Sequence, residues 1–309
     1  MSNFRNSPVV ASDEVASALH EGRGVVALET TIIVQGLPTP TNFEVASECE
    51  AAVRASGAIP ATIGVLDGRA VVGLTMTELE RLADPELHAA KLSSRDIGVA
   101  LATGTDGATT VAGTITIAKR VGIDVMATGG LGGVHRDAHT SFDESADLMA
   151  LARTSVLVVA SGVKSILDIG ATLERLDTFG VPVIGYQTSQ FPGFYMRDSG
   201  FALDWSVASA EEAAHAFMSH REFATSGLLL ANPVGLDKEL DRGVHDAALA
   251  SSLERAQEEG LSGKAVTPAV LSEFARHTEG RSVQVNRDLV VANASLAGEV
   301  AINLARLSA

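Results

Sequence analysis

The chain has 309 residues, of which 46% are hydrophobic and 20% charged, a composition typical of a globular protein with a substantial core. Its formal net charge is −15 and its Lys and Arg residues do not cluster, which argues against nucleic acid as a partner. No apolar run approaches the roughly 18 residues of a membrane span, and the first residues lack the apolar core of a signal peptide. We therefore expect a cytoplasmic protein that binds neither nucleic acid nor membrane and acts on a small molecule.

Cys49 is the only cysteine of the chain. A single cysteine excludes an intramolecular disulfide and any zinc site built from cysteines. Because Cys49 lies on the apolar side of a predicted helix, we expect a buried, inert thiol rather than a nucleophile.

The N-terminal region predicts an arm, a helix and a strand. Residues 1–11 are expected to form a loose arm, and residues 12–22 a short helix with Ser12 as its N-cap. GVVALE (24–29) is predicted to be a strand. It leads into a long proline-containing loop, TTIIVQGLPTP (30–40).

A helix and a hairpin follow this loop. Thr41 and Glu44 have the spacing of a capping box, and apolar residues recur at helical spacing until Gly57, so we predict a helix here. Residues 61–74 contain the turn Asp67–Gly68 between two β-rich runs, which predicts a β-hairpin.

The middle of the chain alternates between helix and strand. Thr77 with Glu80 predicts the start of a short helix, and Lys91 is expected in the loop after it. Residues 109–121 have β-branched side chains but also Ala and Gly at packing positions, and we interpret them as a helix against a sheet. Residues 166–179 predict a helix, and VPVIGY (181–186) the next strand.

Alternating strands and helices predict an α/β fold: a mostly parallel mixed sheet flanked by helices in α/β/α layers. We expect residues 1–309 to form a single domain. The later predicted elements are a helix near 208–222, a strand at 227–233, a helix near 246–259, a helix with Thr267 as N-cap and Pro268 at its first position, and a final helix from about Arg287.

The segment FPGFYMRDSG (191–200) concentrates three aromatic residues and a proline next to Arg197 without periodicity. It has no obvious partner within the chain. We therefore interpret it as a lid or a contact between subunits, and expect a homo-oligomer.

Polar residues follow two consecutive predicted strands. TGGLGGVHR (128–136) comes directly after the apolar run IDVMA, and DESAD (143–147) leads into a helix before VLVVASGVK (156–164). Parallel sheets bind ligands at the carboxyl ends of their strands, and glycine-rich loops and helix N-termini favour anions. This stretch predicts a pocket for a phosphorylated ligand, although two ordinary tight turns would have the same pattern.

Two residues at strand ends suit catalysis. Desolvation of Lys164 could lower its pKa from about 10.4 toward neutrality, which would make its amine a nucleophile. Glu29 ends the strand 24–29, where a raised pKa would suit general acid–base chemistry. From position alone, a solvated lysine and a structural ion pair are the alternatives.

Asp143, Ser145 and Asp147 occupy alternate positions at the start of a predicted helix. Their oxygens suit Mn²⁺ or Mg²⁺, with one carboxylate, substrate and waters forming an open site. The alternative is that Ser145 and Asp147 only cap the helix. His135 could orient a metal-bound water or the base, or serve a structural role.

Taken in order, seven motifs resemble the pseudouridine-5′-phosphate glycosidase family, and together they cover nearly the whole chain. They are LETTIIVQGLPTPTN (28–42), GAIPATIGVLDGR (57–69), GATTVAGTITIA (107–118), TGGLGGVHR (128–136), DESADLMAL (143–151), SGVKSILDIGATLERLDTFGVPVIGY (161–186) and VNRDLVVANASLAGEVA (285–301).

The resemblance implies reversible cleavage of the C–C glycosidic bond of pseudouridine 5′-phosphate to uracil and ribose 5-phosphate. It makes Lys164 the residue that forms an imine with the ring-opened ribose, and Glu29 the proton donor. It also implies a homotrimer with one Mn²⁺ per subunit at Asp143, with Mg²⁺ or another divalent ion as the alternative. This sequence has Glu144 where the family usually has an apolar residue, a departure that concerns the electrostatics of the site.

The same resemblance implies a set of substrate-binding residues. They are Lys91, Val111, Thr128, Gly129, Gly130, His135, Ser145, Ala146, Asp147 and Asn286. Both Asn286 and Asn293, in the last motif, could hydrogen-bond the uracil ring.

Two other functions remain open from the sequence. The first is a C-glycosyl synthase that joins ribose 5-phosphate to another aromatic acceptor by the same imine chemistry. The second is a non-catalytic phosphosugar-binding protein, which would keep the glycine loop but would not need Lys164 and Glu29 together.

Overall fold

The apolar runs of the sequence form strands that are buried on both faces. Every residue of β2 (Val25–Leu28), β8 (Leu157–Ala160) and β11 (Leu228–Ala231) is buried, as expected for parallel strands with a helical layer on each side. The computed structural model describes residues 7–261 and 266–308. Its other strands are β1 (Val9–Ala11), β3 (Ile59–Leu66), β4 (Arg69–Val72), β5 (Ala90–Leu92), β6 (Gly107–Thr109), β7 (Val125–Ala127), β9 (Val183–Tyr186) and β10 (Trp205–Val207).

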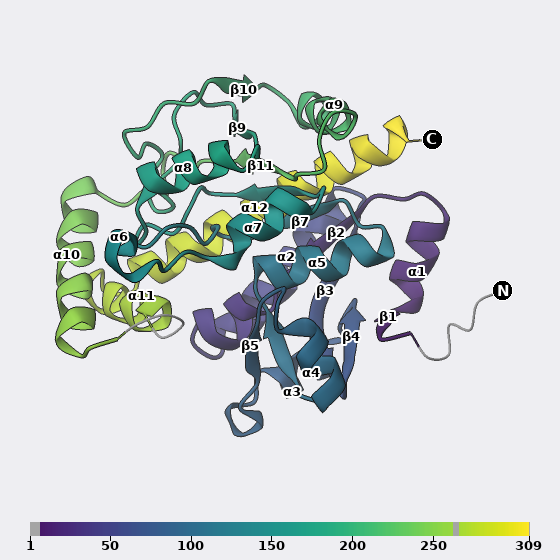
Figure 1. Cartoon of the computed structure of the whole chain (residues 1–309), viewed down its shortest axis with the longest axis horizontal. Coiled ribbons are helices and arrows are strands. Elements are labelled where there is room, and N and C mark those ends of the chain that lie inside the picture. Colours follow the sequence, from purple (N-terminus) through teal and green to yellow (C-terminus); the bar gives the residue numbers. More distant parts are fainter. Residues whose placement is uncertain (1–6, 262–265, 309) are drawn as a thin grey trace.

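The strands form one mixed sheet with a long parallel part. Strands β3, β2, β7, β8, β11, β9 and β10 are neighbours in this order, and each adjacent pair is parallel. The sheet and its flanking helices confirm the predicted α/β class (Figure 1).

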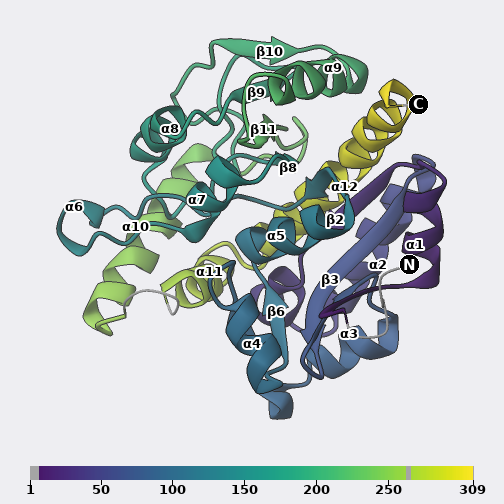
Figure 2. The ribbon, with the colours of Figure 1, turned by 45° about the vertical axis from the view of Figure 1, so that its right-hand side comes forward.

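The predicted hairpin is confirmed and joins the parallel part to a smaller mixed part. The second half of β3 pairs antiparallel with β4 and with β6, while β5 pairs parallel with β6 and β1 parallel with β4. Asp67 and Gly68 have φ of 50° and 69°, and positive φ at both central residues matches the twist of a two-residue hairpin. Figure 2 shows β3 as the long strand at this junction.

Helices cover both faces of the sheet (Figure 1). Helices α5 and α7 pack together on one face, and α12 packs against α2 and α9 on the other. The helices are α1 (Asp13–His20), α2 (Thr41–Ala55), α3 (Met76–Leu82), α4 (Ile97–Thr103), α5 (Val111–Val121), α6 (Ala138–Ser141), α7 (Ala146–Arg153), α8 (Ile169–Thr178), α9 (Ala210–Arg221), α10 (Arg242–Glu258), α11 (Val266–His277), α12 (Arg281–Leu307), the π-helical turn η2 (Ile32–Gly36) and the 3₁₀ turn η3 (Pro85–Leu87).

The final helix, α12, is longer than predicted because it begins at Arg281 rather than near Arg287. Gly280, with φ of 81°, precedes it and ends the preceding turn. By length and composition alone α12 could cross a membrane. In the fold it lies against β2, β7 and β8, so its apolar side faces the sheet.

Three local predictions at helix starts and chain ends are wrong. Thr41 does not cap α2, whose N-cap is Pro40, and Glu44 instead pairs with Arg287 of α12. The capping box of α3 is formed by Thr75 and Glu78, two residues before the predicted pair, because Thr75 has the extended backbone that an N-cap needs. Part of the predicted arm is the strand β1.

One further prediction is wrong, and another concerns side chains that the structure does not describe. Lys91 lies within strand β5 rather than in a loop. The predicted capping of α11 by Thr267 and Pro268 concerns side chains outside the described residues.

The aromatic segment 191–200 packs inside the chain, which corrects the prediction of a lid or a subunit contact. Phe191, Phe194, Tyr195 and Met196 are all buried. The ring of Tyr195 stacks on Phe274 of α11 at 5.0 Å between centroids and meets Phe194 edge-on at 4.6 Å. This segment therefore gives no argument for an oligomer.

Gly24, just before β2, provides a test of how closely α12 packs on the sheet. A Cβ at Gly24 would lie 2.7 Å from the carbonyl carbon of Ala301 and 2.9 Å from the amide nitrogen of Ile302, both backbone atoms of α12. Overpacking against a backbone typically costs about 1–3 kcal/mol. We predict that Gly24→Ala lowers the free energy of unfolding by this amount in a urea titration.

The control is Gly98→Ala. Gly98 is exposed in α4, and a Cβ there meets no atom within 4 Å. Alanine at an exposed helical position should keep or raise stability. Equal stability of the two variants would contradict the close packing of α12 at Gly24.

Candidate functional site

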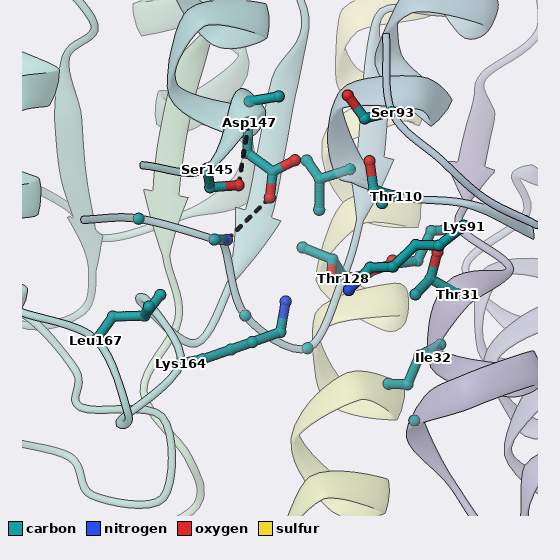
Figure 3. A pocket seen from close by; sticks show the side chains of 18 of the residues that line it. Thr31, Ile32, Lys91, Ser93, Thr110, Thr128, Ser145, Asp147, Lys164 and Leu167 are labelled. Carbon is teal, nitrogen blue, oxygen red and sulfur yellow. Dashed lines mark hydrogen bonds between the residues drawn. The ribbon is translucent and has the colours of Figure 1, made fainter. Parts of the chain in front are cut away.

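A cavity of about 310 Å³ lies at the carboxyl ends of the central strands (Figure 3). Glu29 directly follows β2 and Thr128 directly follows β7, while Lys164 stands in the loop after β8. This is the edge at which parallel α/β sheets bind ligands. The cavity thus lies where the sequence predicted a pocket.

Except for Asn293, the predicted site residues line this cavity, although they come from distant parts of the chain. They are Glu29, Lys91, Val111, Thr128, Gly129, Gly130, His135, Asp143, Ser145, Ala146, Asp147, Lys164 and Asn286. The shared location agrees with a common site, and the role of each residue remains a prediction.

The carboxyl group of Glu29 is buried in the cavity wall. The residue is 8% exposed, and the hydroxyl of Thr128 donates a hydrogen bond to its Oε1. Burial raises the pKa of Glu29 above its ordinary value, although the charges of Lys164 and Lys91 and the Thr128 hydrogen bond act in the opposite direction and Asp147 raises it further. Glu29 therefore keeps its proton to a higher pH than an exposed glutamate, as a proton donor must.

Lys164 is held by the pairing of the two loops that follow β7 and β8. The amide of Leu131 donates to the carbonyl of Gly162 at 2.9 Å, and the amide of Lys164 donates to the carbonyl of Leu131 at 3.1 Å. Gly162 has φ of 79°, and a Cβ there would lie 2.0 Å from the carbonyl oxygen of Pro192, so only glycine fits. The side chain of Lys164 extends from this paired backbone into the cavity (Figure 3).

The carboxylate of Asp147 ties three backbone segments together. Its Oδ1 accepts from the amide of Ala112 in the first turn of α5 at 2.8 Å, and its Oδ2 accepts from the amide of Gly132 at 2.9 Å. Its own amide donates to the hydroxyl of Ser145, which caps α7. The capping alternative holds for Ser145, whereas Asp147 fixes the glycine loop against α5.

The glycine loop is built for close packing. A Cβ at Gly130 would lie 2.5 Å from the ring of Phe194, and one at Gly132 would lie 2.3 Å from the hydroxyl of Ser145. The amides of Leu131 and Gly132 already donate to Gly162 and Asp147. These two amides are thus used within the protein, which weakens the loop as a phosphate cradle.

Asp143 fits a divalent metal ion only as part of an open site. Its carboxylate is about one-third exposed at the cavity edge, 3.8 Å from Nε2 of His135. Within the described residues, no three His, Cys, Asp or Glu side chains group to hold a metal. One carboxylate with waters and substrate phosphate is an arrangement that Mg²⁺ adopts in many sites. The neighbouring Glu144 pairs with Arg175, so its charge is largely balanced.

Polar atoms without a partner in the described chain mark places for a ligand. Thr31 Oγ1, Ser93 Oγ and Asn286 Oδ1 are buried and lack a hydrogen bond, and all three residues line the cavity. Buried polar groups are normally paired, so a ligand or water is expected at each. The sequence prediction missed Thr31, Ser93 and Arg95. Ser93 and Arg95 lie beyond the end of β5, so strand alternation could not have placed them.

Asn293 does not reach the cavity, which corrects its prediction as a uracil-binding residue. The residue is 0% exposed and its amide is hydrogen-bonded within the protein. It lies about two turns beyond Asn286 on α12, and of the two only Asn286 lines the cavity.

Cys49 agrees with its prediction as an inert thiol. It is buried in α2, and burial raises its pKa to about 12. A thiol with this pKa stays protonated at neutral pH and is a poor nucleophile.

Comparison with known proteins gives likenesses along almost the whole chain. The sequence model of the family described as indigoidine synthase A like protein matches residues 14–303. A pseudouridine-5′-phosphate glycosidase from Salinispora tropica is 55% identical over 94% of this chain and 90% of its own length. Another, from Streptomyces griseus, is 51% identical over 94% of this chain and 90% of its own length.

Two solved structures share the fold. A prealnumycin C-glycosynthase in complex with ribulose 5-phosphate is 41% identical, with a TM-score of 0.90 over 97% of this chain and 98% of that one. An indigoidine synthase A-like protein from Thermotoga maritima is 33% identical, with a TM-score of 0.86 over 99% of this chain and 100% of that one. The chain therefore belongs to the pseudouridine-5′-phosphate glycosidase family of indigoidine synthase A-like proteins.

Proposed function

We propose that this protein cleaves the C–C glycosidic bond of pseudouridine 5′-phosphate reversibly, giving uracil and ribose 5-phosphate. The observation that carries the proposal is the buried Glu29, with its raised pKa, in the same cavity wall as Lys164. A buried acid beside an amine is the pair that imine chemistry on a sugar needs. The names of the relatives support the substrate.

A carbon leaving group explains why the pair is a lysine and a single carboxyl group rather than two carboxyl groups. Most glycosidases protonate a leaving oxygen, which a C–C bond lacks. In our proposal the Lys164 nitrogen bonds to C1′ while the C1′–O4′ bond breaks and O4′ takes a proton from Glu29. The nitrogen, positively charged after the attack, gives a proton to the Glu29 carboxylate. Its freed electron pair then forms C1′=N as the C1′–C5 bond breaks, and Glu29 passes that proton to C5 of the base. Water hydrolyses the imine, which releases ribose 5-phosphate and restores Lys164.

Groups around the reacting centre would bind the two ends of the substrate. Lys91, Ser93 and Arg95 bring two cationic side chains and an unpaired hydroxyl to one side of the cavity. The unpaired Oδ1 of Asn286 could accept a hydrogen bond from a ring N–H of uracil. Binding energy from such remote groups can be used to hold the opened sugar.

A divalent ion, Mn²⁺ by family resemblance, forms part of the proposal. Asp143 would hold it, and His135 would face the waters around it. When bound, the ion would supply positive charge to the substrate phosphate.

A C-glycosynthase is the second candidate. It is favoured by the likeness to the prealnumycin C-glycosynthase, whose structure contains ribulose 5-phosphate. The same residues would run the reaction toward bond formation with another acceptor. Release of uracil from pseudouridine 5′-phosphate separates these functions, and no turnover at all would favour a non-catalytic binding protein.

The homotrimer and the cytoplasmic location also remain proposals. With residues 191–200 buried inside the chain, the trimer rests on the family resemblance alone. The location rests on the sequence features described above.

Glu29→Gln tests the proton donor in the proposed reaction. Wild type should release uracil from pseudouridine 5′-phosphate, and the variant should be slower by about 10²–10⁴-fold because glutamine keeps the shape but cannot exchange a proton. Since the Glu29 pKa is raised, wild-type activity should be lost as pH rises through that pKa. The assay is uracil release followed by chromatography across pH.

The control for Glu29→Gln is Glu174→Gln, the same change at an exposed position on α8. Folding disfavours the ionised form of Glu29. At pH values above about 4.3, the pKa of glutamate in the unfolded chain, Glu29→Gln should therefore not lower the free energy of unfolding. A rate loss below about tenfold in Glu29→Gln would mean that another group donates the proton.

Metal dependence is tested by chelation and by Asp143→Asn. EDTA should abolish uracil release and Mn²⁺ should restore it, with the variant needing at least about tenfold more metal. Mn²⁺ binding by calorimetry gives a readout independent of turnover. Asp137→Asn, at an exposed residue just before α6, is the control. Full activity of demetallated wild type would remove the metal from the proposal.

A further inference from the structure

Asn293 is a fully buried polar residue whose side chain joins the ends of three strands. Its Nδ2 donates to the carbonyl of Thr128 at 2.8 Å and lies 3.1 Å from the hydroxyl of Ser161. Its Oδ1 accepts from Nδ2 of Asn232 at 2.9 Å. Thr128, Ser161 and Asn232 are the first residues after β7, β8 and β11.

If the side-chain amide of Asn293 served only to fill space, an apolar residue could replace it. Leucine has a similar size, but it would leave the Thr128 carbonyl without this donor, and a buried unpaired carbonyl is unfavourable. The hydrogen bonds of Asn293 are directional. They fix the orientation of the peptide group between Thr128 and Gly129. The carbonyl oxygen of Gly129 itself lies 3.4 Å from Nδ2 of Asn293.

Thr128 links this network to the cavity. Its amide donates to the carbonyl of Val159 and its carbonyl accepts from Asn293, so both sides of its backbone are held. Its hydroxyl donates to Oε1 of Glu29. The held backbone fixes the Cα from which this hydroxyl projects, and a β-branched side chain has few χ1 rotamers.

We propose that Asn293 is a positioning residue, which acts through Thr128 to hold the carboxyl group of Glu29 in the orientation required for proton transfer. The inference rests on the proposed function for its catalytic meaning. Its structural content, the chain of contacts from Asn293 to Glu29, can be tested without substrate.

The charged groups that face Glu29 are Lys164, Lys91 and Asp147. None of them bonds to Asn293, so substitution of Asn293 leaves these charges in the chain. The Thr128 hydrogen bond lowers the pKa of Glu29, and its loss should therefore raise that pKa. Misplacement of a reacting group by about 1 Å can reduce the rate about 10²-fold.

The experiment is a double-mutant cycle on Thr128→Val and Asn293→Leu. The titration of Glu29 is followed by ¹³C NMR of glutamate side-chain carboxyl groups, with Glu29→Gln identifying its resonance. Each single variant should shift the titration to higher pH and lower kcat by at least about tenfold, with KM changed much less. The double variant should show no further shift, because Asn293 acts through Thr128.

Two controls separate positioning from general damage. Thr128→Ser keeps the hydroxyl, so Glu29 should titrate in this variant as it does in wild type. Gly24→Ala perturbs the opposite end of β2 and should lower stability without moving the titration of Glu29. If Asn293→Leu does not fold, Asn232→Ala releases the amide from its other side and should shift the titration in the same direction.

The outcomes distinguish the inference from the proposed function. A folded Asn293→Leu with the wild-type titration, or shifts that add in the double variant, overturns the positioning role. A wild type that does not cleave pseudouridine 5′-phosphate, together with the expected shifts, rejects the proposed function and keeps the link from Asn293 to Glu29.

Discussion

Burial of one carboxyl group at the end of a parallel strand is the constraint on which the site depends. A carboxylate taken from water is strongly disfavoured unless it is paired or keeps its proton. The fold places Glu29 there beside the Thr128 hydroxyl and within reach of the charges of Lys164 and Lys91. The balance leaves an acid with a raised pKa next to an amine, and the proposed chemistry follows from that balance.

The surrounding fold maintains this arrangement with buried polar networks. On the β3 side, the hydroxyls of Thr30 and Thr109 both donate to the carbonyl of Ile63, which joins the ends of β2 and β6 to the middle of β3. On the other side, Asp147 accepts two backbone amides and fixes the glycine loop to α5. A fully satisfied network of this kind is rigid, and rigidity is what a site of reacting groups requires.

The sequence predicted the fold class and the location of the site because both follow from local patterns. Apolar runs that alternate with helices predict a parallel sheet, and the strand ends of such a sheet bring Glu29, Thr128 and Lys164 together. Roles that depend on long-range geometry could not be predicted. Asn293 lies about two turns beyond Asn286 on the same side of α12, and both are buried, yet only Asn286 lines the cavity. Thr41 likewise has a good capping sequence, but Glu44 meets Arg287 from the far end of the chain.

The central claim is that Lys164 forms a covalent imine with the sugar, and reductive trapping tests it most directly. Borohydride added during incubation with ribose 5-phosphate should reduce the imine to a stable secondary amine, and peptide mapping should place the sugar on Lys164. Lys164→Arg should not be trapped, because a guanidinium keeps its proton and has no free electron pair. A sugar adduct on Lys91 instead, or a Lys164→Ala variant that still cleaves pseudouridine 5′-phosphate, would contradict the account.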